Sequence, residues 1–201
     1  TFSPAQGRKA ARLNSGVSYF MKMIALTLLL ATLASSVGAQ DNKGVWRTPD
    51  GTAVPESASQ KSAGSLGGMI LLTPDQDWKE KWETPKETIP QFNQASEVER
   101  DGSLFLITFF GGASQDEVGR SNLLCDFTLV RPDGSFAIEQ HDVACFPTDF
   151  AMERGITYMT NITIAFKADS SEPTGSWTYR VTLKDKIAST ELPLEASFTV
   201  K

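Results

Sequence analysis

The chain has 201 residues, of which 40% are hydrophobic and 21% charged, with 24 acidic and 19 basic side chains. Its formal net charge of −5 argues against nucleic acid and anionic membrane surfaces as partners, because both bind cationic patches. We therefore expect no nucleic-acid partner.

Residues 21–39 have the organisation of a secretory signal peptide. At helical rise their apolar run spans roughly 18 Å, well short of the ~30 Å of bilayer hydrocarbon. Val37-Gly38-Ala39 supplies the small residues of a cleavage site. Four basic residues flank the run: Arg8, Lys9, Arg12 and Lys22. We favour a cleaved signal peptide over an uncleaved anchor or a buried helix. Residues 1–20 are then an upstream extension that is not native.

Cleavage near Ala39 predicts a periplasmic or secreted protein without a stable membrane anchor. It removes four basic and no acidic residues, so the remaining chain carries a net charge of −9. An exported protein with two cysteines, Cys125 and Cys145, favours a disulfide worth roughly 3 kcal/mol, with two buried thiols as the alternative. One histidine and two cysteines are too few for a zinc site, so we expect no metal and no cofactor.

The first part of the exported chain is expected to be irregular. Residues 40–64 are polar and aperiodic, which is typical of a flexible leader. LGGMILLT, at 66–73, predicts a buried strand. Thr73 and Pro74 then predict the start of a helix that ends before Pro85. Trp78 and Trp82 lie four residues apart and therefore share one face of it.

From residue 95 onward the pattern is that of strands separated by turns. We expect strands at 95–100, 103–110, 123–131, 135–140, 156–166, 176–185 and 191–200. Asp101-Gly102 predicts a hairpin between the first two of these. With the strand at 66–73, the pattern predicts an all-β, antiparallel sandwich of seven to eight strands with one short N-terminal helix.

The hairpin around Asp133-Gly134 allows a test of the disulfide. Pairing Leu129 with Ile138 places Cys125, Phe127 and Leu129 on one face with Phe136 and Ile138. The same register sets Cys125 opposite Asp142 rather than Cys145. A disulfide therefore requires the chain to bulge or leave the ladder after His141.

The C-terminal third resembles bacterial immunoglobulin-like domains. SSEPTGSWTYRVTLKDK followed by LEASFTV is similar to their closing strand pair. FFGGASQDEVG and CDFTLVRPDGS resemble segments of a group of uncharacterised exported proteobacterial proteins. The resemblance covers about residues 66–200. It implies an immunoglobulin-like domain at 65–201, and no reaction or catalytic residues.

Several residues are candidates for a site, although none forms a catalytic motif. His141 lies between acids and suggests a general base oriented by Asp142. Asp116 and Glu117 lie in a long polar loop without the spacing of a calcium site. Trp78 and Trp82 could stack on sugars, but large apolar residues at this spacing more often pack a helix onto a core.

These observations give three hypotheses for function. The leading one is a non-enzymatic exported module that binds another protein or a cell-envelope component through the loops at 111–122, 146–155 and 167–175. The second is a carbohydrate-binding module that uses Trp78, Trp82 or an exposed Phe146 or Phe150. The third is a hydrolase that uses His141.

Overall fold

The computed structural model describes residues 46–48, 50–85 and 89–201. The predicted signal peptide at 21–39 and the extension at 1–20 lie outside these residues. Regular structure in the described part is almost all β-strand, with one five-residue helix. No helix of this part is long and apolar enough to cross a membrane. The prediction of an all-β fold with one short helix is confirmed for the described residues.

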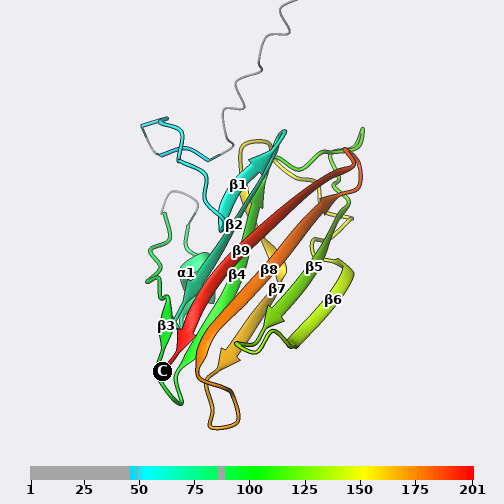
Figure 1. Cartoon of the computed structure of the whole chain (residues 1–201). Coiled ribbons are helices and arrows are strands. Elements are labelled where there is room, and N and C mark those ends of the chain that lie inside the picture. Colours follow the sequence, from blue (N-terminus) through cyan, green and yellow to red (C-terminus); the bar gives the residue numbers. More distant parts are fainter. Residues whose placement is uncertain (1–45, 49, 86–88) are drawn as a thin grey trace, which may run out of the picture. The chain divides into compact units, whose positions relative to one another are not determined.

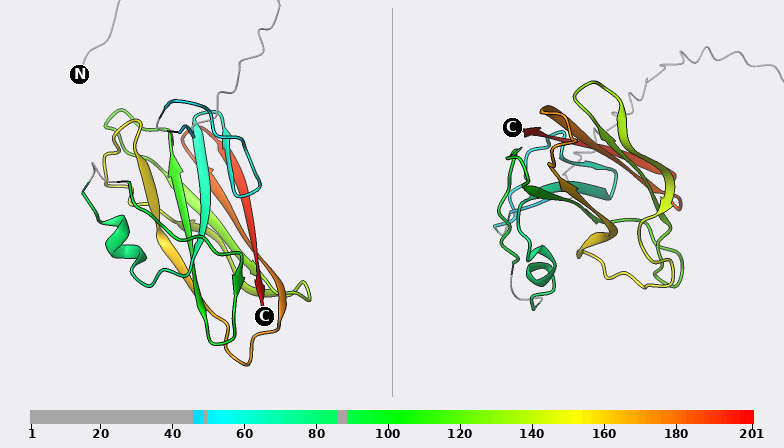
Figure 2. Two further views of the ribbon diagram at one scale, coloured as in Figure 1. Left: turned by 90° about the vertical axis from the view of Figure 1, so that its left-hand side faces the viewer. Right: turned by 90° about the horizontal axis from the view of Figure 1, so that it is seen from below.

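The strands form two sheets that face each other (Figures 1 and 2). The first has the order β1-β2-β4-β7, formed by Gln60–Ala63, Leu66–Thr73, Ser103–Gly111 and Thr157–Lys167. The second has the order β3-β9-β8-β5-β6, formed by Glu97–Val98, Thr190–Val200, Gly175–Asp185, Leu123–Val130 and Phe136–Ala144. All pairs are antiparallel except β3 with β9, which is parallel.

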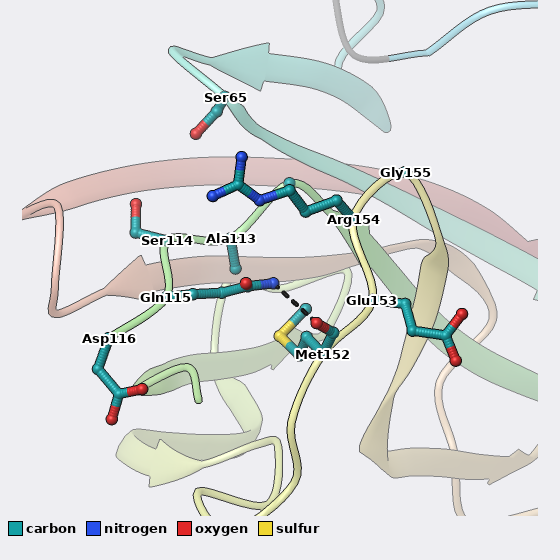
Figure 3. Close-up of a pocket in the computed structure, with 10 residues that line it drawn as sticks. Ser65, Ala113, Ser114, Gln115, Asp116, Met152, Glu153, Arg154 and Gly155 are labelled. Atoms are coloured by element: carbon teal, nitrogen blue, oxygen red, sulfur yellow. Dashed lines mark hydrogen bonds between the residues drawn. The ribbon is translucent and has the colours of Figure 1, made fainter. Parts of the chain in front are cut away.

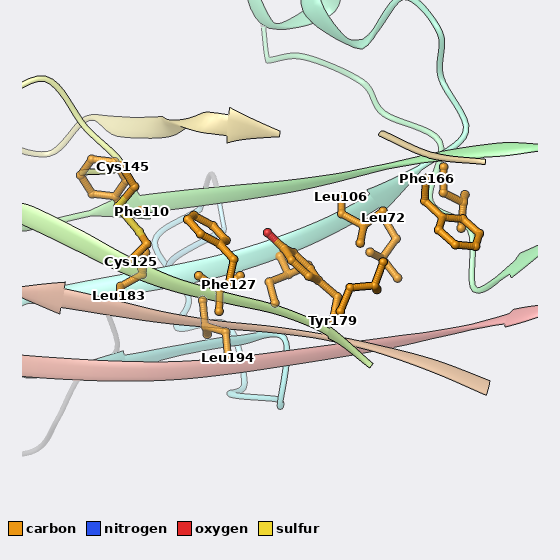
Figure 4. Packing of buried hydrophobic residues seen from close by; sticks show 14 of the residues in the cluster. Leu72, Leu106, Phe110, Cys125, Phe127, Cys145, Phe166, Tyr179, Leu183 and Leu194 are labelled. Carbon is orange, nitrogen blue, oxygen red and sulfur yellow. A yellow bond between two sulfur atoms is a disulfide. The ribbon is translucent and has the colours of Figure 1, made fainter. Parts of the chain in front are cut away.

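The main core lies between the two sheets (Figure 4). Alternation along β8 buries Trp177, Tyr179, Val181 and Leu183 completely, as the sequence predicts. The Tyr179 hydroxyl has one buried neighbour, the Thr108 hydroxyl at 3.4 Å. Burial raises the pKa of this phenol well above its usual value. Tyr179 is therefore a neutral core residue.

A second apolar cluster covers the outer face of the first sheet. Leu71, Ile107 and Phe109 are buried there. Helix α1, at Trp78–Trp82, packs on them through its two tryptophans. The rings of Trp82 and Phe109 lie 5.0 Å apart, centroid to centroid. Strands β2 and β4 are thus buried on both faces, which explains why their sequences are continuously apolar.

The helix begins later than the sequence predicts. Thr73 remains in β2, and its hydroxyl accepts a hydrogen bond from the Asp75 amide at 3.1 Å. Asp75 is buried and pairs with the Lys81 ammonium at 2.7 Å. The hydrogen bond from Lys81 and two hydrogen bonds from Asn93 lower the pKa of the Asp75 carboxyl, although burial opposes them. These bonds hold the segment before residue 78 in a turn, so α1 starts only at Trp78.

Part of the expected flexible leader is ordered. Gln60–Ala63 forms β1, which pairs with β2, so the number of strands in the described part is nine rather than seven or eight. Upstream of it, the Trp46 indole donates a hydrogen bond to the Gly68 carbonyl at 3.2 Å and packs on the outer cluster. Backbone pairing of β1, the Ala63 side chain and one indole thus attach the described part of this segment to the sheet.

The predicted hairpin at Asp101-Gly102 is wrong. Both edges of β4 are already paired, with β2 and with β7. The preceding segment therefore has no free edge in that sheet, and Glu97–Val98 pairs with β9 in the other one. Val98 buries its side chain in the core there. The tight turn joins two sheets instead of two neighbouring strands.

The disulfide prediction is confirmed. Cys125 and Cys145 are bonded, with their Cα atoms 5.7 Å apart. Leu129 pairs with Ile138 as expected, and the register then shifts between Cys125 and Phe127. His141 and Asp142 together lie opposite Asp126, and Asp142 has a φ of +50°. This bulge supplies the departure from the ladder that the disulfide requires.

One residue of this hairpin faces the other way. Phe136 was expected in the core but is half exposed. A second register shift sets Val130 opposite Phe136, whereas unbroken pairing from Leu129 and Ile138 would set it opposite Ala137. Because side chains alternate along a strand, a one-residue shift moves Phe136 to the outside.

Candidate functional site

Two long loops are bonded to each other at one end of the sandwich. The β4–β5 loop, 112–122, and the β6–β7 loop, 145–156, form a bridge between Arg120 and Ala151. The Met152 amide donates a hydrogen bond to the Gly119 carbonyl at 2.9 Å. The Gln115 amide group donates another to the Met152 carbonyl at 3.1 Å. These bonds give the loops a defined shape.

The first candidate site is a hollow of about 380 Å³ that these loops share with the β1–β2 turn. We call it the loop-end hollow; Ser65, residues 112–116 and residues 152–155 line it (Figure 3). Ala113 and Met152 are its buried apolar residues. The Arg154 guanidinium extends toward the hydroxyls of Ser65 and Ser114 (Figure 3). The hollow is therefore rich in hydrogen-bond donors.

Local hydrogen bonds position the walls of the hollow. The Asp185 carboxylate is buried and accepts hydrogen bonds from the amides of Ser114, Ile187 and Ala188. Gly112, with a φ of +65°, lies so close to Ser65 that an added Cβ would be 2.1 Å from the Ser65 carbonyl oxygen. The site depends on a glycine at this position, because any other residue would push the β1–β2 turn away.

Only one of the two acids predicted for this loop lines the hollow. The Asp116 carboxylate accepts hydrogen bonds from the amides of Val118 and Arg120, at 3.0 and 2.8 Å. It therefore stabilises the loop's own turn and points away from Arg154 (Figure 3). Glu117 is exposed and lines none of the hollows described here. No group of three metal-binding side chains occurs among the described residues.

The second candidate site is a groove of about 350 Å³ that is also lined in part by the β6–β7 loop. We call it the aromatic groove; its apolar lining consists of Trp82, Pro85, Pro90, Phe150, Ile156 and Tyr158. Phe150 is 47% and Ile156 40% exposed. The rings of Phe146, Phe150 and Tyr158 contact one another edge to face, which holds the loop on the sheet. Exposed apolar surface of this kind is typical of a binding site.

The predicted tryptophan pair is divided between two roles. Trp78 packs on Phe105 of β4, with ring centroids 6.0 Å apart, and lines neither site. Trp82 packs on Phe109 and also lines the aromatic groove. Of the two phenylalanines predicted to be exposed, Phe146 is buried and Phe150 is not. Packing therefore accounts for Trp78 and Phe146, while Trp82 and Phe150 remain available to a ligand.

His141 lies apart from both sites, on the edge strand β6. Its side chain is 61% exposed and contacts the carboxylates of Asp126, at 3.5 Å, and Glu139, at 3.4 Å. The predicted orienting partner is wrong, because the Asp142 carboxylate binds the Lys184 ammonium at 2.8 Å. Burial raises the pKa of Asp126, but Lys184 and the Asp142 amide outweigh it and hold that pKa below its usual value.

Nothing in the sequence pointed to three of the residues that line these two sites. Ser65 and Arg154 lie in polar loops with no motif, and Tyr158 belongs to a strand whose alternation suggested only packing. Their roles follow from how the loops fold against one another. The long polar loops themselves were the one usable signal, and the hollow lies between two of those named as candidates.

Comparison with known proteins adds little. No family model and no curated protein matches the chain. A family 123 glycoside hydrolase from Clostridium perfringens is 12% identical, with a TM-score of 0.39 over 68% of this chain and 27% of that one. A Niemann-Pick type C2 protein from the Japanese carpenter ant is 9% identical, with a TM-score of 0.36 over 66% of this chain and 89% of that one. The C-terminal domain of wzt is 8% identical, with a TM-score of 0.32 over 52% of this chain and 63% of that one. The chain thus spans about a quarter of the glycoside hydrolase, and function must be argued from the two sites.

Proposed function

We propose that this protein is an exported, non-enzymatic binding module of immunoglobulin-like architecture that recognises another protein or a cell-envelope component through its loop end. The observation that carries the proposal is the loop-end hollow, where Arg154, Ser65 and Ser114 present donor groups from three separate segments. Within the described residues, these three side chains make no hydrogen bond or ion pair. Polar groups that converge without internal partners are typical of a recognition site.

Two further observations support the export and the architecture. Disulfides such as Cys125–Cys145 persist in oxidising compartments, which agrees with the signal peptide predicted at 21–39. Two facing sheets that share one core agree with the resemblance of the C-terminal strands to immunoglobulin-like domains. Such scaffolds bind their ligands through loops that a rigid sandwich holds in place.

A bulky residue at the rim of the hollow is expected to abolish partner capture. Ser65 is exposed, so Ser65→Trp would fill the hollow without disturbing the core. The immobilised processed protein should capture a partner from cell-envelope extracts, and Ser65→Trp should reduce that capture at least tenfold with an unchanged Tm. Ser176→Trp is the matched control, because Ser176 is also an exposed serine but lies near the start of β8. The hollow lies near the opposite end of that strand, where Asp185 accepts a hydrogen bond from the Ser114 amide. Equal capture by both variants would refute the proposal.

The aromatic groove supports carbohydrate binding as a second candidate. Sugars stack on exposed aromatic rings, and this groove combines Trp82, Phe150 and Tyr158 with the hydroxyls of Thr84 and Thr157. A glycan that binds should change the tryptophan emission of the protein, and Trp82→Ala should abolish binding to the same glycan on an array. Trp78→Ala is the control because Trp78 lies on the same helix outside the groove. A glycan retained by Trp82→Ala would exclude this role.

A further inference from the structure

Arg154 has no acidic partner among the described residues of this acidic protein. Its side chain is exposed, and none of the described residues forms an ion pair or hydrogen bond with it. The nearest acids of the hollow do not compete for it, because the carboxylates of Asp116 and Glu153 point away (Figure 3). In a chain with 24 acids against 19 bases, a guanidinium that is left unpaired beside a hollow is available to an anion.

The neighbours of Arg154 complete a set of donors. The hydroxyls of Ser65 and Ser114 face the guanidinium across the hollow, each from a different loop (Figure 3). A guanidinium carries five N–H donors in a planar fork and no acceptor. This fork matches two oxygens of one oxyanion, and each hydroxyl adds a further donor. These three donors favour a ligand group that accepts hydrogen bonds.

The charges near the site favour an ion with a single negative charge. Arg154 is the only cation among the residues that line the hollow. Asp185 lies below Ser114, but its carboxylate is already compensated by three backbone amides. Asp116 and Glu153 are the acids that line the hollow. A phosphate dianion would therefore keep one uncompensated negative charge near these two carboxylates, whereas the single charge of a carboxylate would be neutralised by Arg154.

The lining of the hollow favours a peptide over an acidic sugar. No aromatic ring is among its lining residues, so a pyranose ring would find no surface on which to stack. A carboxylate on an acidic side chain or at a chain end needs only the donors that are present. Resting on the proposed function, we infer that the loop-end hollow binds a carboxylate of a protein partner, with Arg154 as the charged contact.

The inference can be tested by NMR titration of the ¹⁵N-labelled processed protein at constant ionic strength. The probes are sodium acetate and two forms of one short peptide: the first form ends in a free carboxylate, and the second ends in an amide. We expect saturable shifts of the Ser65, Ser114 and Gly155 amides, and at least tenfold tighter binding of the free-acid peptide. Arg154→Gln should abolish both effects. Arg120→Gln is the matched control, since Arg120 is an exposed arginine of the neighbouring loop outside the hollow.

Three outcomes would overturn the inference. The first is equal binding of acid and amide peptides, and the second is unchanged binding by Arg154→Gln. The third is tighter binding of phosphate or glucuronate than of acetate, which would assign the hollow to another ligand class. The capture experiment separates the two proposals. If Ser65→Trp loses the partner but Arg154→Gln keeps it, the binding function holds and the carboxylate role fails. If Ser65→Trp keeps the partner, the function itself fails.

Discussion

Replacing Cys125 and Cys145 together by alanine is expected to lower the free energy of unfolding by about 3 kcal/mol. The bond closes a loop with a sequence separation of 20, and its loss increases the conformational entropy of the unfolded chain. Both cysteines are fully buried, so the missing sulfur atoms also leave a small void between the sheets. Urea unfolding followed by intrinsic fluorescence measures the loss.

Reduction of the wild-type protein provides a matched control for this prediction. Dithiothreitol breaks the same bond but leaves both sulfur atoms in the core, so the difference from the double alanine variant isolates the packing contribution. The alanine variant should be the less stable of the two. A combined loss under 1 kcal/mol would show that β5 and β6 hold together without the bond.

Replacing Gly112 by alanine is expected to destabilise the protein by about 3 kcal/mol or more, because two costs add. A residue with a Cβ is strained at a φ of +65°, and that Cβ would meet the Ser65 carbonyl oxygen at 2.1 Å. Backbone must move to relieve such a contact. Thermal unfolding should report a lower Tm, and NMR shifts should be concentrated in the β1–β2 turn and the 112–122 loop.

Gly134→Ala is the control that separates the two costs. Gly134 has a φ of +86°, but an added Cβ would meet no atom within 4 Å. Its substitution should therefore destabilise by only about 1 kcal/mol, the strain of the left-handed conformation alone. If both variants lost the same stability, the close contact between Gly112 and Ser65 would not shape the loop-end hollow.

The sequence predicted best those features that depend on neighbouring residues. Alternation identified the core face of β8, and the turn at Asp133-Gly134 set Leu129 opposite Ile138. The bulge after His141 followed because two geometric requirements, ladder register and disulfide reach, could not otherwise be met together.

Features that depend on distant segments were not predicted correctly. The turn at Asp101-Gly102 has the composition of a hairpin, but the pairing of β4 with β2 and β7 leaves no place for one. The helix was placed too early because the bonds of Asp75 to Lys81 and Asn93 carry no signal in the local sequence. Sequence can propose that a polar loop binds something; which of its side chains remain unpaired depends on how the loops fold together.

The bulged edge strand β6 also bears on how copies of this protein behave beside one another. An open edge invites a strand from another molecule, which is how domain-swapped dimers and fibrils begin. Here Glu139, His141 and Asp142 place ionisable groups along that edge, and the left-handed turn of Asp142 interrupts its row of amides and carbonyls. An incoming strand could not stay in register past this point, so β6 should not pair along its full length with a strand of another molecule.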